Sequence, residues 1–116
     1  MIEASRLLII NNMIARIWRS VTLVSQADYY LDILNKTVTL PCQSAEGNQG
    51  IYIFRELRGE LAHFLLISFW ESSEALYNYA GSENHHLNHT EEELEYLIAS
   101  ESLATDYELM VGREII

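Results

Sequence analysis

The sequence predicts an α+β domain in which helices cover one face of an antiparallel four-stranded sheet. Three observations predict this fold class. Strand-like segments alternate apolar and polar residues, two stretches between them have helical spacing of apolar residues, and a β-hairpin stands in the middle. A chain of 116 residues has the length that builds one hydrophobic core.

The first predicted strand covers residues 13–21. Its side chains alternate, so Ile14, Arg16 and Trp18 share one face. An amphipathic helix over residues 25–37 follows, with Ser25 as its N-cap.

Pro41 is expected to end any helix that reaches it, because proline lacks the amide hydrogen and clashes with the preceding turn. The polar segment 43–50 then predicts a loop.

The hairpin consists of two β-rich runs, 51–57 and 61–70, around a short turn that contains a glycine. The second run is almost entirely apolar, with His63 and Ser68 as its polar side chains. We therefore expect this run at the centre of the sheet, covered on both faces.

A helix over residues 73–80 follows, with Ser72 or Ser73 as its cap and Gly81 as its stop. A capping box then begins a short helix at Thr90. Its predicted apolar stripe consists of Leu94, Leu97 and Ile98. An alternating last strand covers residues 104–112.

The resulting order, β-α-β-β-α-(α)-β, is the ferredoxin-like split β-α-β. Helices then cover one face of the sheet. Trp18, Tyr52 or Ile53, and part of the run 61–70 are expected on the other face. A twofold homodimer, in which two sheets close into a barrel, would cover that face.

The composition excludes several classes of protein. The net charge of −10 repels phosphate backbones, so no nucleic-acid partner is expected. The single cysteine, Cys42, excludes an internal disulfide and suits a reducing compartment. No apolar run is long enough for a membrane span or a signal peptide, so a cytoplasmic protein without a membrane partner is expected.

The predicted domain covers residues 13–113, followed by a short tail at 114–116. Residues 1–12 are an N-terminal extension, which is either an extra edge segment or the product of an upstream start, because Met13 opens the first strand.

Four segments resemble the antibiotic biosynthesis monooxygenase domain. They read MIARIWR, GNQGIYIFREL, FLLISFWESSEAL and EYLI…DYELMVG, and the resemblance extends over about residues 13–113. The resemblance implies a homodimeric α+β barrel with a pocket between each sheet and its helices.

Members of that family oxygenate polycyclic phenols or oxidise quinols with O₂, without flavin, haem or metal. The resemblance therefore implies a cofactor-independent, monooxygenase-like oxidation of a small aromatic, quinol or polyketide-type substrate. A deprotonated, electron-rich phenol can itself give an electron to O₂. The protein then has to exclude water, remove a proton and stabilise the anion. No cofactor and no metal are expected.

The resemblance and the side-chain chemistry select aromatic candidates. Trp70 stands where the family has its tryptophan, and it would be a pocket wall or an indole N–H donor. Leu66 replaces an asparagine of the polyketide-oxidising members. Tyr77 and Tyr79 lie on the following helix, where either could donate a hydrogen bond to a substrate oxygen.

The candidate bases are His63 and His89, because a neutral imidazole near pH 7 can take a phenolic proton. Trp18 is a second candidate wall. Arg16 would pair with an acid or hold a substrate anion, and its partner would decide between these roles.

Three other interpretations stay open at this point. His85, His86 and His89 form a cluster that is solvated surface, a metal site to which Glu92 or Glu93 could add a carboxylate, or the source of the base. A branch of the family degrades haem. Compared with the pattern of that branch, this sequence has His89 at the position of the axial histidine. It has Tyr79 in place of the helix tryptophan and Arg19 in place of an asparagine on the first strand.

A non-catalytic, ligand-binding or stress-associated dimer is the rival class. A pocket filled by its own side chains, with every histidine facing solvent, would favour that class.

Overall fold

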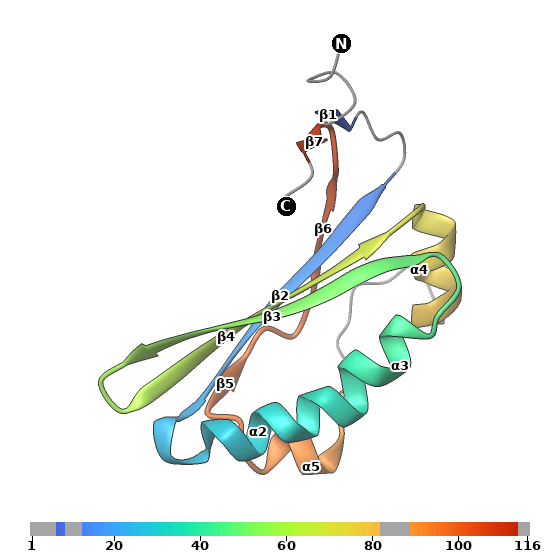
Figure 1. Ribbon diagram of the computed structural model, residues 1–116. Helices are drawn as coiled ribbons and strands as arrows, with labels where there is room; N and C mark the ends of the chain where they lie inside the picture. Colours follow the sequence, from blue (N-terminus) through green and yellow to red (C-terminus); the bar gives the residue numbers. More distant parts are fainter. Residues whose placement is uncertain (1–6, 9–12, 82–88, 114–116) are drawn as a thin grey trace.

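The computed structural model describes residues 7–8, 13–81 and 89–113, and it confirms the α+β fold class. A five-stranded antiparallel sheet has the order β3-β4-β2-β5, and β6 pairs with β2 along the same edge as β5 (Figure 1). The strands are β2 (Ile14–Leu23), β3 (Asn48–Arg58), β4 (Leu61–Trp70), β5 (Ala99–Ser100) and β6 (Thr105–Glu108). The predicted last strand thus takes its expected place beside the first, but that edge of the sheet is shared with β5.

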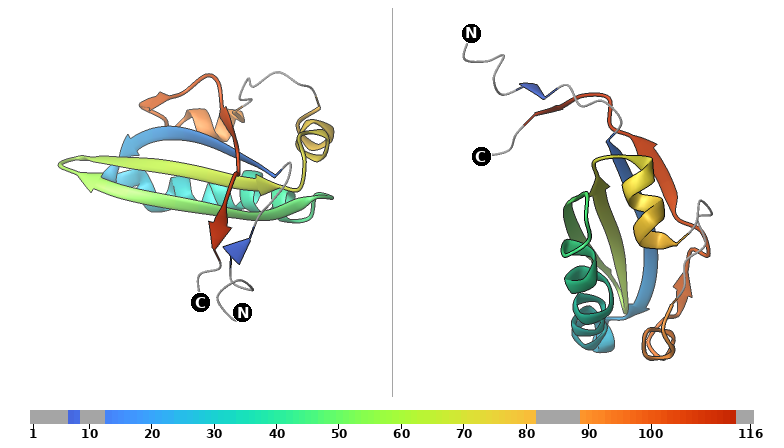
Figure 2. Two further views of the ribbon diagram at one scale, coloured as in Figure 1. Left: turned by 90° about the horizontal axis from the view of Figure 1, so that it is seen from above. Right: turned by 90° about the vertical axis from the view of Figure 1, so that its right-hand side faces the viewer.

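The helical segments lie on one side of this sheet (Figures 1 and 2). Four of them follow one another without a break: η1 (Val24–Gln26), α2 (Ala27–Leu34), η2 (Asn35–Thr39) and α3 (Leu40–Gln43). The other two are α4 (Ser73–Ala80) and α5 (Glu91–Leu94).

The expectation that Pro41 ends the first helix is wrong. The segment η2 is a π-helix, in which the amide of Leu40 bonds to the carbonyl of Asn35, five residues earlier. Pro41 then occupies the first turn of α3, where a missing amide hydrogen costs little. The wider π turn therefore lets the chain stay helical as far as Gln43.

The even-numbered side chains of β2 face the helices and build the core. Trp18 packs there with Tyr30 and Leu34 of α2 and with Phe64 and Leu66 of β4. A second buried cluster near the other end consists of Ile14, Cys42, Trp70 and Leu76. The prediction that Trp18 lies on the uncovered face is wrong, because alternation along a strand does not say which face the helices take.

The opposite face of the sheet is called the open face below. The pairing register places on it Ala15, Ile17, Arg19, Val21, Tyr52, Phe54, Glu56, His63, Leu65, Ile67, Phe69, Thr105 and Tyr107. Of these, Tyr52, Phe54 and Tyr107 are 56%, 53% and 54% exposed. Tyr52 is on this face as expected, whereas Ile53 faces the helices.

The central place of β4 is confirmed, but a single chain covers only one of its faces. The helix-facing residues Ala62, Phe64, Leu66 and Trp70 are buried. The residues that alternate with them on the open face are half-buried. The described elements therefore cover one face of β4, and the expected cover of the second face is not found among them.

The predicted N-cap Ser25 is wrong, because Ser25 lies inside η1, and neither Leu23 before η1 nor Gln26 before α2 makes a side-chain capping bond.

The predicted caps of the two later helices are confirmed. Ser72 accepts a hydrogen bond from the amide of Ala75 at the start of α4, and Gly81 ends it in the left-handed conformation at φ +86°. The hydroxyl of Thr90 accepts a hydrogen bond from the amide of Glu93 at the start of α5.

The predicted apolar stripe of this last helix is wrong. The helix ends at Leu94, and both Leu94 and Ile98 are exposed. The amide of Ile98 bonds to the carbonyl of Val21, because the chain has already turned to reach the edge of β2.

Part of the N-terminal extension pairs with the end of the chain. Strand β1 (Leu7–Leu8) pairs antiparallel with β7 (Gly112–Arg113), and the two lie beyond the ends of β2 and β6 (Figure 1). Among the described residues, no helix is both long enough and apolar enough to cross a membrane.

Candidate functional site

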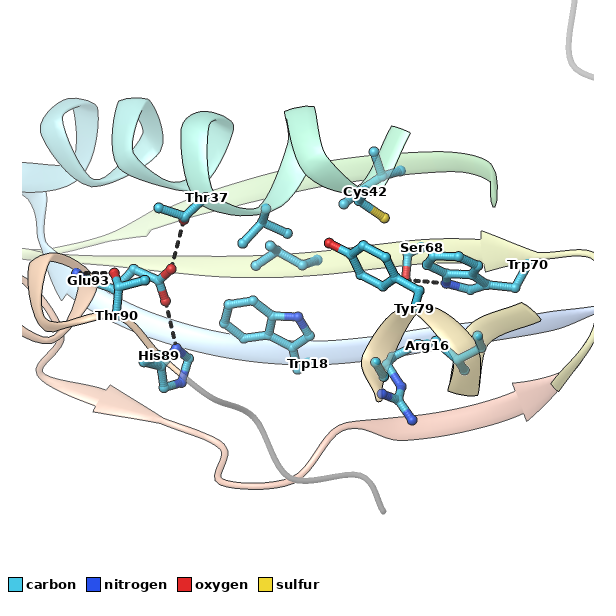
Figure 3. Close-up of a pocket in the computed structure, with 15 residues that line it drawn as sticks. Arg16, Trp18, Thr37, Cys42, Ser68, Trp70, Tyr79, His89, Thr90 and Glu93 are labelled. Carbon is cyan, nitrogen blue, oxygen red and sulfur yellow. Dashed lines mark hydrogen bonds and ion pairs between the residues drawn. The ribbon is translucent and has the colours of Figure 1, made fainter. Parts of the chain in front are cut away.

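A cavity of about 210 Å³ lies between the helix-facing side of the sheet and the helices (Figure 3). Its walls come from β2, β3 and β4 on one side and from η2, α3, α4 and α5 on the other. The described residues that line it are Arg16, Trp18, Thr37, Val38, Cys42, Ile51, Leu66, Ser68, Trp70, Leu76, Tyr79, Ala80, His89, Thr90 and Glu93.

Aromatic rings form one end of the cavity. Trp70 and Tyr79 lie with their ring centres 5.1 Å apart, and the Tyr79 ring points from α4 toward the middle of the cavity (Figure 3). The indole Nε1 of Trp70 donates to Ser68 Oγ at 3.0 Å. Trp70 is therefore a wall, and its N–H is already used within the protein.

Two polar hydrogens in the cavity have no described hydrogen-bond acceptor: those of Trp18 Nε1 and the Tyr79 hydroxyl. The Ser68 hydroxyl accepts from Trp70 and donates to no described residue. Burial, followed by the nearby Cys42, raises the pKa of Tyr79, so its hydroxyl stays a donor at neutral pH. These groups can donate to an oxygen atom of a ligand.

A buried acid and a histidine form the other end. Thr37 Oγ1 donates to Glu93 Oε1 at 2.7 Å, and His89 Nδ1 lies 2.9 Å from Glu93 Oε2. The side chain of Glu93 reaches into the cavity beside Trp18 (Figure 3). The second ring nitrogen of His89, Nε2, lies 2.8 Å from Ser100 Oγ.

The His89 ring packs against Trp18 at an interplanar angle of 60°, with ring centres 5.3 Å apart. Both ring nitrogens have hydrogen-bond partners in the protein. This arrangement fixes the orientation of the imidazole from three sides.

Arg16 has an acidic partner. Its Nε and Nη2 atoms bond to the two carboxylate oxygens of Asp106 on β6 at 2.8 and 2.9 Å. Both side chains are almost buried, so the bidentate pair neutralises the guanidinium and ties β6 to β2. Arg16 was expected either to pair with an acid or to hold a substrate anion, and the structure shows the first of these roles.

The thiol of Cys42 lies in the cavity wall. Burial raises its pKa to about 11, and Asn48 Nδ2 donates to its sulfur at 3.3 Å. The sulfur therefore stays a protonated thiol at neutral pH and is a weak nucleophile there.

The structure brings together five of the residues that the sequence selects: Arg16, Trp18, Trp70, Tyr79 and His89. The other two do not line this cavity. His63 is on the open face, beside Arg19, Glu56 and Arg58. Successive side chains of a strand point to opposite faces, so His63 lies on the other face of β4 from Leu66 and Ser68. It therefore cannot share the cavity with His89.

Tyr77 packs against the buried cluster around Trp70 and contributes no hydroxyl to the cavity. Of the histidine cluster, His85 and His86 lie outside the described residues. Within residues 7–8, 13–81 and 89–113, no three His, Cys, Asp or Glu side chains come together as metal ligands.

Sequence reasoning missed Thr37 and Ser100, and it considered Glu93 only as an extra carboxylate for a metal site at the histidine cluster. Glu93 stands in an acidic run, 91–93, in which its two neighbours are exposed, and the run alone predicts a solvated helix start. Its position relative to the cap was a usable signal, because a glutamate three residues after the N-cap has a fixed direction.

Comparisons with known proteins support the fold. No family model and no curated protein matches the sequence. A candidate antibiotic biosynthesis monooxygenase from Bacillus cereus has a similar structure, with a TM-score of 0.64, 14% identity, and coverage of 90% of this chain and 100% of that one. A second candidate of that kind, from Chloroflexus aurantiacus J-10-fl, has a TM-score of 0.60, 13% identity, and coverage of 90% and 99%.

A third similar structure is an arginine-to-serine variant of MhuD with two manganese protoporphyrin IX molecules bound per active site. Its TM-score is 0.56, its identity is 17%, and the coverage is 87% of this chain and 98% of that one. The chain thus has the ferredoxin-like α+β fold of antibiotic biosynthesis monooxygenases, at an identity that shows the fold alone.

Proposed function

We propose that the cavity binds a small phenol or quinol and promotes its oxidation by O₂ without a cofactor. The observation that carries the proposal is the pairing of apolar aromatic walls with an acid–histidine pair at one end and unpartnered donors beside it. The similar fold of candidate monooxygenases gives further support.

The size of the cavity limits the substrate. Cavities that hold drug-sized ligands have volumes of about 300–1,000 Å³, and this one has about 210 Å³. The proposed substrate therefore has one or two fused rings rather than the three or four of a polyketide-type compound. Trp18 and Trp70 supply flat surfaces for such rings.

The donors suit the anion that forms when the substrate loses a proton. Trp18 Nε1, Tyr79 and Ser68 can each donate to a phenolate oxygen. Fixed donors in a cavity with little water stabilise developing negative charge more than water would. The phenolate then transfers an electron to O₂, which the neutral phenol does far less readily.

The reaction can take either of two balanced forms. A hydroquinone passes two electrons and two protons to O₂, which gives a quinone and hydrogen peroxide. Alternatively, a phenol is oxygenated at a ring carbon. One oxygen atom of O₂ enters the ring, and the other leaves as water with two hydrogens of the phenol, which gives a quinone. Isotopically labelled O₂ distinguishes the two outcomes, because only the second reaction labels the quinone.

The test measures O₂ consumption and quinone absorbance with 1,4-naphthohydroquinone, benzohydroquinone and 1-naphthol in air. We expect at least one of them to be oxidised at a rate that is proportional to protein and saturates with substrate. Val38→Phe places a ring in the cavity and should lower this rate at least tenfold, whereas Val24→Phe, at an exposed valine of η1, should not. Equal rates in the two variants, or none above autoxidation, would contradict the proposal.

Haem does not fit this site. Both nitrogens of His89 are held by Glu93 and Ser100, so neither is available to an iron atom. The cavity is also smaller than one that holds a drug-sized molecule, and a porphyrin is larger still. Within the described residues, the site therefore supports no chemistry that depends on haem.

A purely non-catalytic barrel is also less well supported. A cavity filled by its own side chains, with every histidine facing solvent, would have favoured that class. The cavity here is open to a ligand, and the His89 side chain is only 12% exposed.

The proposed functional unit is a homodimer. The open face has apolar side chains over β2, β3, β4 and β6 without any helix to cover it. Monomers rarely expose so much contiguous apolar surface, and a second copy would cover it with an identical face.

A further inference from the structure

The acidic run at the start of α5 contains one residue that behaves unlike its neighbours. Glu91 and Glu92 are exposed, whereas Glu93 is 3% exposed and lines the cavity. In a capping box the third-position glutamate bonds back to the backbone of the cap residue. Here the carboxylate of Glu93 instead bonds to Thr37 and His89.

Burying a carboxylate is costly unless donors offset the loss of water. Each oxygen of Glu93 has one hydrogen-bond partner, Thr37 Oγ1 at 2.7 Å and His89 Nδ1 at 2.9 Å. The Thr37 hydroxyl also lies 2.9 Å from the carbonyl oxygen of Ile33, so the two acceptors share its single hydrogen. No arginine or lysine among the described residues pairs with it. Its side-chain partners are therefore a hydroxyl and an imidazole rather than a permanent cation.

The number of hydrogen bonds leaves room for one more donor. A carboxylate has about four lone-pair sites. The described residues occupy two of those on Glu93, one on each oxygen. The remaining sites can accept a hydrogen from a ligand in the cavity that Glu93 lines.

His89 is differently placed. Its Nδ1 faces Glu93 and its Nε2 faces Ser100 Oγ, whose hydroxyl also lies 3.1 Å from the carbonyl of Glu101. Because both ring nitrogens face protein groups, neither is directed at a ligand in the cavity. It can hold Glu93 in place and lower the cost of its charge.

We propose that Glu93 is the group that accepts the proton of the substrate hydroxyl, and that His89 and Thr37 are positioning residues that act through Glu93. The inference rests on the proposed function and refines its site. The substrate O–H bond breaks, an O–H bond forms on Glu93, and the electron pair stays on the substrate oxygen. Trp18 Nε1 and the Tyr79 hydroxyl then donate to that oxygen.

The same arrangement determines which ligands the cavity accepts. A neutral hydroxyl can donate to Glu93, whereas a ligand carboxylate would bring a second negative charge into a site of low polarity. The substrate class is therefore a neutral hydroxylated aromatic of one or two rings.

The catalytic test compares Glu93→Gln with Glu92→Gln, an equally conservative change at the exposed neighbour on the same helix. We expect E93Q to lower kcat/KM for the hydroquinone that the wild type oxidises by about 100-fold or more, which is the usual contribution of general-base catalysis. E93Q should also lose the acid limb of the pH profile, and E92Q should retain both.

His89→Asn separates the two roles, because an asparagine amide nitrogen stands close to the place of Nδ1 and can donate to Glu93. We expect H89N to retain kcat/KM within about tenfold, and His89→Ala to lose more. If H89N loses as much as E93Q, or E93Q no more than E92Q, the assignment of Glu93 is overturned.

A binding measurement that does not depend on turnover tests the inference separately from the proposed function. By calorimetry at neutral pH, the wild type and E92Q should bind 2-naphthol at least tenfold more tightly than 2-naphthoate. E93Q should bind the two within about threefold. Equal binding of both by the wild type, or no binding of 2-naphthol, would overturn the inference even if a quinol is oxidised.

The converse result would contradict only the proposed function. In that result, the protein prefers 2-naphthol to 2-naphthoate, the preference depends on Glu93, and no O₂ is consumed. Glu93 would then accept a hydrogen bond from the ligand in a protein that binds such ligands but does not oxidise them. The far-ultraviolet circular dichroism and thermal unfolding of each variant check that it is folded.

Discussion

At the scale of single residues, the core contains a polar pair that the cavity does not use. The hydroxyls of Ser20 on β2 and Tyr30 on α2 lie 2.8 Å apart, and both residues are buried. Burial, the largest influence, raises the pKa of Tyr30 to about 12, and the Ser20 hydrogen bond opposes it in part. The pair links α2 to β2 at the buried cluster around Trp18, to which Tyr30 itself belongs.

This pair predicts an alkaline loss of stability. Because Tyr30 ionises near pH 10 when unfolded and near 12 when folded, the unfolded chain holds fewer protons between these values, and the free energy of unfolding falls as pH rises. The loss should amount to about 2–3 kcal/mol across this window. Urea unfolding of wild type and Tyr30→Phe at several pH values measures it, and an identical slope in both would contradict the assignment.

The residue types alone could not predict which face of β2 forms the site. The alternation of β2 placed Arg16 and Trp18 on one face, but Ala15, Ile17 and Val21 make the other face equally apolar. The choice between the faces depends on where α2 packs. In the same way, the third place after the N-cap distinguishes Glu93 from its two neighbours, but its burial also depends on Thr37, which lies in a distant helix.

At the scale of elements, the π-helix η2 links the fold to the site. Thr37 and Val38, which line the cavity, both belong to it, and Pro41 follows in α3. A π turn is rare and often occurs at functional sites. The strands and the ends of α4 could be predicted because alternation, turns and caps are local signals. A π turn has no such signal, and so the end of the first helix was misplaced.

The π turn predicts the effect of removing the proline. In a regular helix interior, Pro41→Ala would stabilise the protein by about 3 kcal/mol. In the first turn of α3 after η2, proline costs little, and it also restricts the unfolded chain. We therefore expect P41A to change the free energy of urea unfolding by less than about 1 kcal/mol. A gain near the larger figure would mean that Pro41 strains the helix.

At the scale of the whole molecule, the cavity and the exposed aromatic residues lie on opposite faces of the sheet. The cavity lies entirely on the helix-facing side, between elements of one chain. The open face presents Tyr52, Phe54 and Tyr107 to solvent, with Ile17 and Ile67 between them. If a second copy covers this face, association can be disrupted without changing the cavity.

The matched variants for this prediction are Phe54→Asp on the open face and Tyr29→Asp on the outer side of α2, where the tyrosine is also exposed. By light scattering, wild type and Y29D should have twice the 13.4 kDa mass of one chain. F54D should be monomeric, or should dissociate at least tenfold more readily, because a buried unpaired charge costs several kcal/mol. Because the described residues of one chain line the cavity on its sheet side and on its helix side, monomeric F54D should still bind 2-naphthol. A monomeric wild type would contradict the dimer, and loss of naphthol binding in a folded F54D would show that the partner helps to shape the cavity.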